Sequence, residues 1–484
     1  MADDDRRSAS DGGGSGTGTS ALASYFGFAE RGTDLQTEVV AGVTTFLAMS
    51  YIIVVNPAIL TGVPSENKPG IVLQGYTPTE VQQMLTVVTI VSSVIALLVM
   101  AFYANRPFGL APGLGLNAFF ALTVIGALGV PWQTALAAVF TEGVIFILLT
   151  AVGARTYIIR LFPPPVKYAI GTGIGLFLAI IGLQAMQVVV DDPATLVALG
   201  PVASDPVALL AVLGLFVTLA LYARGVRGSI VIGIVLTTVL GYLATVAGLV
   251  DPGVLFPATL PSAQYDITPL IGAFLAGFTN VDSFAFALIV FTFFFVDFFD
   301  TAGTLVGVGQ AGGFLDEDGN FPDIDKPLMA DAVGTTAGGI LGTSTITTFV
   351  ESATGVEEGG RTGMTALVIA ALFLVALVIV PFAAVIPQYA SHIALVVVAL
   401  LMLRNVVDIE WGNIAHAIPA GLTILIMPLT YSIAYGIAAG LISYPIAKTA
   451  VGEFEDIGVG QWLIAAAFVV YFFVRTSGML QGAM

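Results

Sequence analysis

The stretch LGTSTITTFVESATGVEEGGRTG, Leu341 to Gly363, lies between apolar runs, yet it is rich in hydroxyls and glycine and carries a carboxylate, Glu351. A bilayer tolerates irregular backbone only where protein covers it or where it lines a cavity. An ionisable group at that depth indicates a functional site. The stretch therefore predicts one wall of a substrate cavity. A surface loop holding Glu351 with Glu357 and Glu358 is the alternative, disfavoured because residues 343–350 carry no charge.

An aromatic run with two acids lies just upstream. In FTFFFVDFFDTAG, Phe291 to Gly303, Asp297 and Asp300 stand among phenylalanine and valine. A run this apolar is hard to place in water, so we expect it inside a membrane span. Residues three apart share one face of a helix. The run predicts a second wall of the same cavity, with both acids on one face.

The composition is that of a polytopic membrane protein. Of the 484 residues, 57% are hydrophobic and 10% are charged, and the mean hydropathy is +0.98. A span needs roughly 20 apolar residues, and the chain has many such runs. Cysteine is absent, which excludes disulfides. The net charge of -17 suggests a cell with a salty interior, such as a halophilic archaeon.

The apolar runs predict an all-α fold of fourteen spans, the thirteenth at residues 424–446 after an interfacial stretch that begins at residue 408. The bias of Lys and Arg between alternate loops predicts a multi-pass protein with both termini in the cytoplasm. The expected organisation is an acidic, disordered tail at 1–33, a first repeat at 34–250, a loop with an interfacial segment at 251–282, a second repeat at 283–476 and a C-terminal tail at 477–484.

Each half has a glycine-rich, interrupted segment as its third element. The first is residues 109–128, with Asn117, and the second is residues 341–355, with Glu351. Seven spans per half is an odd number, so the second half enters the membrane from the opposite side. Such inverted repeats are typical of secondary transporters, whose substrate sites lie at paired broken helices near the midplane.

Four strings give the chain a specific resemblance to a known family. They are TTFLAMSYIIVVNPAIL, APGLGLNAFFA, VDFFDTAGTLVG and GTSTITTFVESATGVEEGGRTG, in this order. The chain resembles the nucleobase:cation symporter-2 family (nucleobase-ascorbate transporters, xanthine/uracil permeases), in particular its adenine-guanine-hypoxanthine permease branch. The resemblance implies a core domain from spans 1–4 and 8–11, a gate domain from spans 5–7 and 12–14, short extended strands in spans 3 and 10, and a homodimer through the gate domain.

The resemblance also implies roles for individual residues. Relatives in the uracil and xanthine branches carry a Glu and a residue one turn later on the eighth span, where this chain has Asp297 and Asp300, so the division of roles between these two stays open. The expected substrate-binding residues are Asn117, Asp297, Glu351, Phe349, Val350, Ser352, Thr348 and Gly115. The expected proton-coupling residues are Asp300, Asp297, Glu351 and Asp331.

The function expected from the resemblance is uptake of purine nucleobases (hypoxanthine, adenine, guanine) across the cell membrane by symport with H+, or with Na+ in its place. Ring N–H groups of a purine suit carboxylate acceptors. A uracil/xanthine transporter or an anion transporter of the same fold is the alternative, although an anion favours a positive cavity. We expect that the protein is not an enzyme and that it binds no cofactor, metal or nucleic acid. We also expect membrane lipid to surround it. The only histidines, His392 and His416, are far from the acids in sequence, and no GxxxxGK[ST] motif is present.

Overall fold

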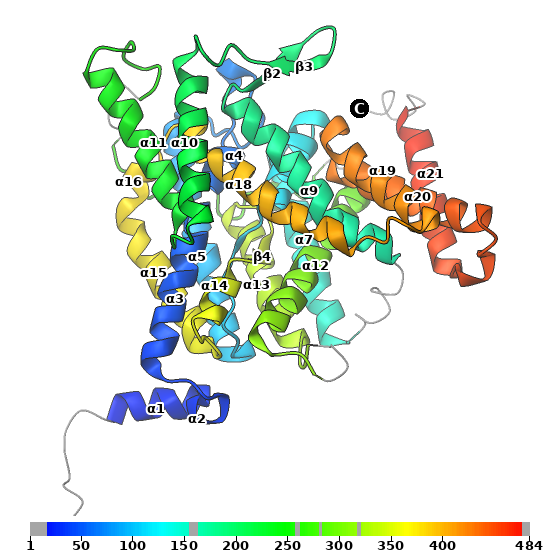
Figure 1. Ribbon diagram of the computed structural model, residues 1–484. Helices are drawn as coiled ribbons and strands as arrows, with labels where there is room; N and C mark the ends of the chain where they lie inside the picture. Colours follow the sequence, from blue (N-terminus) through cyan, green and yellow to red (C-terminus); the bar gives the residue numbers. More distant parts are fainter. Residues whose placement is uncertain (1–16, 154–162, 257–261, 280–282, 317–320, 477–484) are drawn as a thin grey trace, which may run out of the picture.

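The structure is a computed structural model that describes residues 17–153, 163–256, 262–279, 283–316 and 321–476 (Figure 1). Nine helices among these residues are long and apolar enough to cross a membrane. The predicted all-α membrane fold is confirmed. Two interrupted segments replace ordinary helices at the third and tenth elements, as expected.

The first half runs from α1 to α11. Its helices are α1 (Thr17–Phe26), α2 (Phe28–Arg31), α3 (Leu35–Met49), α4 (Ile52–Leu60), α5 (Pro78–Val99), α6 (Leu114–Ala118), α7 (Trp132–Ala151), α9 (Pro164–Ala185), α10 (Pro206–Ala223) and α11 (Ser229–Val246). Its strands are β1 (Leu110–Pro112), β2 (Val189–Asp192) and β3 (Leu196–Leu199). A wider π-helical turn extends α5 to Ala104, and another extends α6 to Ala127.

The second half runs from a 3-10 turn at Ala273–Phe278 to α21. Its elements are α12 (Ser283–Gly312), α13 (Asp325–Leu341), β4 (Ile346–Thr348), α14 (Ser352–Glu357), α15 (Gly363–Ala376), α16 (Val380–Ala383), α17 (Gln388–Ser391), α18 (Ile393–Met402), α19 (Ile414–Thr430), α20 (Ile433–Ala450) and α21 (Val459–Thr476).

The strands β1 and β4 pair with each other near the centre of the molecule, where Figure 1 labels β4, and we call this place the strand crossing. They pair antiparallel, with Leu110 opposite Thr348 and Pro112 opposite Ile346, and every residue of both strands is buried. Only glycine fits after β1, because a Cβ on Gly113 would lie 2.4 Å from Cγ2 of Thr347. The pairing satisfies backbone groups that a broken helix leaves open inside a membrane.

Two groups of helices surround this crossing. On one side, α13 packs against α7 and α5, and α15 packs against α3 and α5. On the other side, α9 packs against α18 and α19, while α10 and α11 pack against each other and against α17 and α18. Figure 1 shows α10 and α11 on the left, and α19 and α20 on the right.

The chain from Thr17 to Arg31 is helical, so the prediction of a disordered tail is wrong for this part; residues 1–16 lie outside the described residues. The cause is aromatic packing, because Phe26 is fully buried. The hydroxyl of Tyr25 donates to the carbonyl of Phe102, 2.9 Å away, and the amide of Asn105 donates to the carbonyl of Phe26 at 3.2 Å. The predicted tail at 477–484 also lies outside the described residues.

The expected thirteenth span, residues 424–446, is wrong. The chain turns at Tyr431, whose φ of 52° is left-handed, so α19 ends at Thr430 and α20 begins at Ile433. The stretch expected to lie at the interface instead forms the start of α19, where Asn413 caps the backbone N–H of Ala415 at 3.0 Å. Residues 414–450 therefore form two helices, α19 and α20, which meet at Tyr431, and α21 follows them.

Candidate functional site

A cavity of about 960 Å³ lies beside the crossing of β1 and β4. One face of α12 forms a smooth wall, because Val296, Asp300, Gly303, Thr304 and Gly307 recur at helical spacing and all line the cavity. A Cβ on Gly303 or Gly307 would meet no atom within 4 Å, so both glycines border open space. The interrupted segments complete the wall with residues 113–116 and 347–351.

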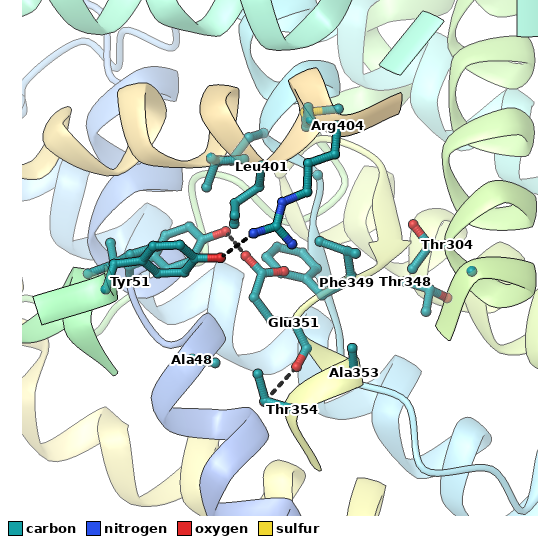
Figure 2. Close-up of a pocket in the computed structure, with 18 of the residues that line it drawn as sticks. Ala48, Tyr51, Thr304, Thr348, Phe349, Glu351, Ala353, Thr354, Leu401 and Arg404 are labelled. Carbon is teal, nitrogen blue, oxygen red and sulfur yellow. Dashed lines mark hydrogen bonds between the residues drawn. The ribbon is translucent and has the colours of Figure 1, made fainter. Parts of the chain in front are cut away.

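Glu351 lies at the cavity wall, at the start of α14. The hydroxyl of Tyr51 donates to its Oε1 at 2.6 Å, a short hydrogen bond between buried groups (Figure 2). Tyr51 stands between α3 and α4, where the first span is interrupted, and only 2% of its surface is exposed. One carboxylate oxygen is thus fixed by the first span.

Asp300 approaches the cavity from α12. The hydroxyl of Thr347 in β4 lies 3.5 Å from its Oδ2. Asp300 and Glu351 are close enough for their charges to interact, and both line the cavity. The cavity therefore holds two carboxyl groups, from the aromatic run and the hydroxyl-rich stretch that the sequence singled out.

Asp297 faces away from the cavity. It is fully buried and lies within hydrogen-bonding reach of Glu142 on α7 and Asp331 on α13. No N–H or O–H donor in the described part of the chain reaches either oxygen of Asp297. The hydroxyl of Thr345 donates to Oε2 of Glu142 at 3.0 Å, and that of Thr301 donates to Oδ2 of Asp331 at 2.9 Å. We call Glu142, Asp297 and Asp331 the carboxyl cluster.

Asn117 and Ser352 support the crossing from outside the cavity. The hydroxyl of Ser344 donates to Oδ1 of Asn117, which ties α6 to the chain before β4. The hydroxyl of Ser352 accepts from the backbone N–H of Gly109 at 2.9 Å and donates to the carbonyl of Phe349 at 2.6 Å.

The predicted site residues thus fall into two sets. The cavity is lined by Asp300, Glu351, Phe349, Val350, Thr348 and Gly115. Asn117, Asp297, Asp331 and Ser352 lie behind its wall, fully buried.

Cationic side chains lie towards the cavity mouth. Arg404, just after α18, points towards Tyr51 and Glu351 in Figure 2 and contacts the hydroxyl of Tyr222 at 3.4 Å. Arg227, in the turn between α10 and α11, forms an ion pair with Glu358 at the end of α14. This pair joins the turn between α10 and α11 to the end of α14, and α14 packs against α3.

Sequence reasoning did not identify Tyr51 and Glu142. A signal existed for Glu142, because it is an ionisable residue inside the apolar fourth span, and such residues are functional candidates. Tyr51 gave no signal beyond its place within the family-like string, since an isolated tyrosine in an apolar span is ordinary.

Comparison with known proteins gives the following matches. The profile of the Permease family matches residues 36–439. The adenine permease AdeP of Escherichia coli is 36% identical, over 94% of this chain and 96% of AdeP. The guanine/hypoxanthine permease PbuG of Bacillus subtilis is 37% identical, over 93% of this chain and 99% of PbuG.

Among solved structures, the transmembrane domain of the cyanobacterial bicarbonate transporter BicA matches with a TM-score of 0.58. The match covers 85% of this chain and 97% of that domain at 17% identity. At this identity the likeness concerns the fold.

Proposed function

Because this chain belongs to the nucleobase:cation symporter-2 family, the xanthine/uracil permeases, we propose that it carries purine nucleobases across the cell membrane. The proposed substrates are hypoxanthine, adenine and guanine, in line with the names of the adenine and guanine/hypoxanthine permeases to which it is similar. The observation that carries the proposal is the cavity beside the strand crossing, where Asp300 and Glu351 face one space.

The chemistry of this cavity suits a flat heterocycle rich in N–H groups. An ionised carboxylate only accepts hydrogen bonds, so Asp300 and Glu351 match the ring N–H donors of a purine. Phe349 adds an aromatic surface at the same wall. The cavity volume, about 960 Å³, is within the range of small-molecule sites and leaves room for water around the base.

We further propose that transport is symport with H+, since a carboxyl group can alternate between a protonated and a charged form as the cavity opens to either side. Asp297, Asp300, Glu351 and Asp331 are the proposed coupling residues. The core domain (spans 1–4 and 8–11) would move relative to the gate domain (spans 5–7 and 12–14). The ion pair of Arg227 with Glu358 joins the two domains, so it would break and re-form during each cycle.

The alternative within this fold is an anion transporter or a uracil/xanthine transporter. The guanidinium of Arg404 at the mouth favours an anion, and the fold is like that of a bicarbonate transporter. Two carboxyl groups inside the cavity oppose an anion, because burying like charges together is costly.

We also propose that the protein is a homodimer, surrounded by membrane lipid, with its N-terminus in the cytoplasm. Arg31 supports this orientation, since its guanidinium donates to the carbonyls of Asn105 and Arg361 at 3.0 and 3.1 Å, gathering arginines beside α1 and α2. A cytoplasmic C-terminus requires that α21 does not cross the membrane after α20. Labelling of single cysteines introduced near each end tests both positions, because the chain has no cysteine of its own.

The decisive experiment is uptake of radiolabelled hypoxanthine into proteoliposomes with an imposed pH or Na+ gradient. We expect accumulation that depends on the pH gradient and is competed by adenine and guanine but not by bicarbonate or sulfate. Glu351→Gln and Asp300→Asn should abolish it, while Glu66→Gln, at an exposed acid of the loop after α4, should not. Competition by bicarbonate, or full uptake by both cavity variants, would contradict the proposal.

A further inference from the structure

A chain of hydroxyl groups connects the carboxyl cluster with the cavity. The hydroxyl of Thr301, on α12, donates to Oδ2 of Asp331 at 2.9 Å. The same hydroxyl lies 2.7 Å from Oγ1 of Thr347, on β4, and either atom can be the donor. Oγ1 of Thr347 in turn lies 3.5 Å from Oδ2 of Asp300, which lines the cavity.

The carboxyl cluster must itself hold protons. A hydrogen bond between two carboxyl groups needs a proton, because ionised carboxylates have no donor. Asp297 lies within hydrogen-bonding reach of Glu142 and Asp331, and no N–H or O–H donor in the described ranges reaches its oxygens. Two shared protons therefore satisfy the cluster as it stands.

We propose that Thr301 and Thr347 form a relay that passes a proton between the carboxyl cluster and Asp300 at the cavity wall. The inference rests on the proposed proton-coupled transport and names the path that the proton takes. It makes the cluster a proton store behind the site, and it gives Glu142 the role of a positioning residue that holds Asp297.

The transfer balances without any other reactant. The carboxyl proton of Asp331 moves to the oxygen of Thr301, the former hydroxyl proton of Thr301 moves to Thr347, and that of Thr347 moves to Asp300. One O–H bond breaks and one forms at each hydroxyl, so both threonines end neutral. Asp331 ends as a carboxylate and Asp300 as an acid. Before the transfer, Oδ2 of Asp331 carries the proton, Thr301 donates to Thr347 and Thr347 donates to Asp300. The transfer leaves Thr347 donating to Thr301 and Thr301 donating to Asp331, as in the structure, and rotation of both hydroxyls resets the path.

The groups that face this path share one sign. They are Glu142 from α7, Asp297 and Asp300 from α12, Asp331 from α13 and Glu351 from the start of α14, with the neutral phenol of Tyr51 beside Glu351. A proton delivered to Asp300 reduces the repulsion between Asp300 and Glu351. Each transfer along the relay thus makes the cavity less negative by one charge and the carboxyl cluster more negative by one charge.

The test replaces each hydroxyl by a methyl group of the same shape, in Thr301→Val and Thr347→Val. Thr301→Ser and Thr347→Ser keep the hydroxyl and serve as rescue variants. Thr292→Val is the control on α12, since its hydroxyl donates to the carbonyl of Leu288 on the same helix at 2.8 Å. Thr335→Val is the control for support of β4, because the hydroxyl of Thr335 bonds the carbonyl of Ile346 at 2.9 Å but lies outside the relay.

Two readouts separate coupling from binding. Exchange of labelled for unlabelled hypoxanthine at equal pH needs binding and movement, but no net proton transfer. Thr301 lies behind the cavity wall, so we expect Thr301→Val to retain exchange within about twofold. Thr347 lines the cavity, so the readout for Thr347→Val is its accumulation relative to its own exchange rate. Accumulation driven by a pH gradient should fall by ~10-fold or more, the size of a typical coupling between sites. The serine variants and both controls should accumulate like the parent, and the valine variants should lose the pH dependence of the parent's uptake.

Several results would overturn the relay. These are normal pH-driven accumulation by either relay valine variant, an equal loss in the serine variants, an equal loss in Thr335→Val, or a loss of exchange together with accumulation in Thr301→Val. A parent protein that exchanges hypoxanthine but ignores the pH gradient, or follows a Na+ gradient instead, also overturns it. Failure of the proposed function is a different result, because the parent would then neither exchange nor accumulate any purine.

Discussion

Removing one hydroxyl tests how Glu351 is held. Tyr51→Phe deletes the donor that lies 2.6 Å from Oε1 of Glu351 and leaves the ring packed, since the side chain is 2% exposed. A hydrogen bond to a charged group contributes about 1.5–3 kcal/mol. With about 1.4 kcal/mol for each factor of ten, substrate affinity should weaken roughly 10- to 100-fold if Glu351 must be aligned to accept from the base.

The assay is direct binding of labelled hypoxanthine to purified protein in detergent, with initial uptake rates in proteoliposomes alongside. Tyr25→Phe is the matched control, because its hydroxyl donates to the carbonyl of Phe102 at 2.9 Å, at an exposed place far from the cavity wall. Binding by Tyr51→Phe equal to that of the control would refute the reasoning. So would a melting temperature lowered enough to account for the whole loss.

Three further predictions concern other parts of the structure. Gly303→Leu should block uptake without lowering the melting temperature, because its side chain would enter the open space of the cavity. Glu38→Ala should destabilise the protein by about 3 kcal/mol, measured as lower thermal stability in detergent, since the buried carboxylate accepts from Arg361 N and from the N–H and hydroxyl of Thr365 at the start of α15. Burial lowers the pKa of Lys68, in the loop after α4, from 10.5 to about 8. Folding therefore favours the neutral amine, so the melting temperature should rise between about pH 8 and 10.5. Lys68→Met should lack the part of this rise that Lys68 contributes.

Much of the architecture could be predicted because membrane burial imposes strong patterns on a sequence. Runs of about 20 apolar residues reveal spans, and glycine with proline at residues 112–115 reveals a broken one. Helix ends inside continuous apolar sequence give no such signal. The break at Tyr431 depends on a left-handed residue whose carbonyl accepts from the hydroxyl of Thr123 at 2.7 Å, which is a contact between distant parts of the chain.

The candidate site could be predicted as a neighbourhood but not in detail. The aromatic run and the hydroxyl-rich stretch do meet beside one cavity, at Asp300 and Glu351. The spacing of three residues predicted that Asp297 and Asp300 share one face of the helix. Three residues turn a helix by about 300°, however, so the two side chains point in directions about 60° apart. That angle directs Asp297 to Glu142 and Asp331, while Asp300 faces the cavity. The neighbouring helices decide which side of a helix borders the cavity. The sequence of a single span therefore does not show which of its two acids lines the cavity.

The crossing of β1 and β4 has a consequence for biogenesis. The backbone N–H of Gly109 finds its partner, the hydroxyl of Ser352, 243 positions further along the chain. At about 5–20 residues per second, a ribosome needs roughly 10–50 s to supply that partner. During this interval the nascent first half holds an open strand that no lipid can satisfy. Newly made protein should therefore depend on the insertion machinery, or on retained water, until the later half emerges.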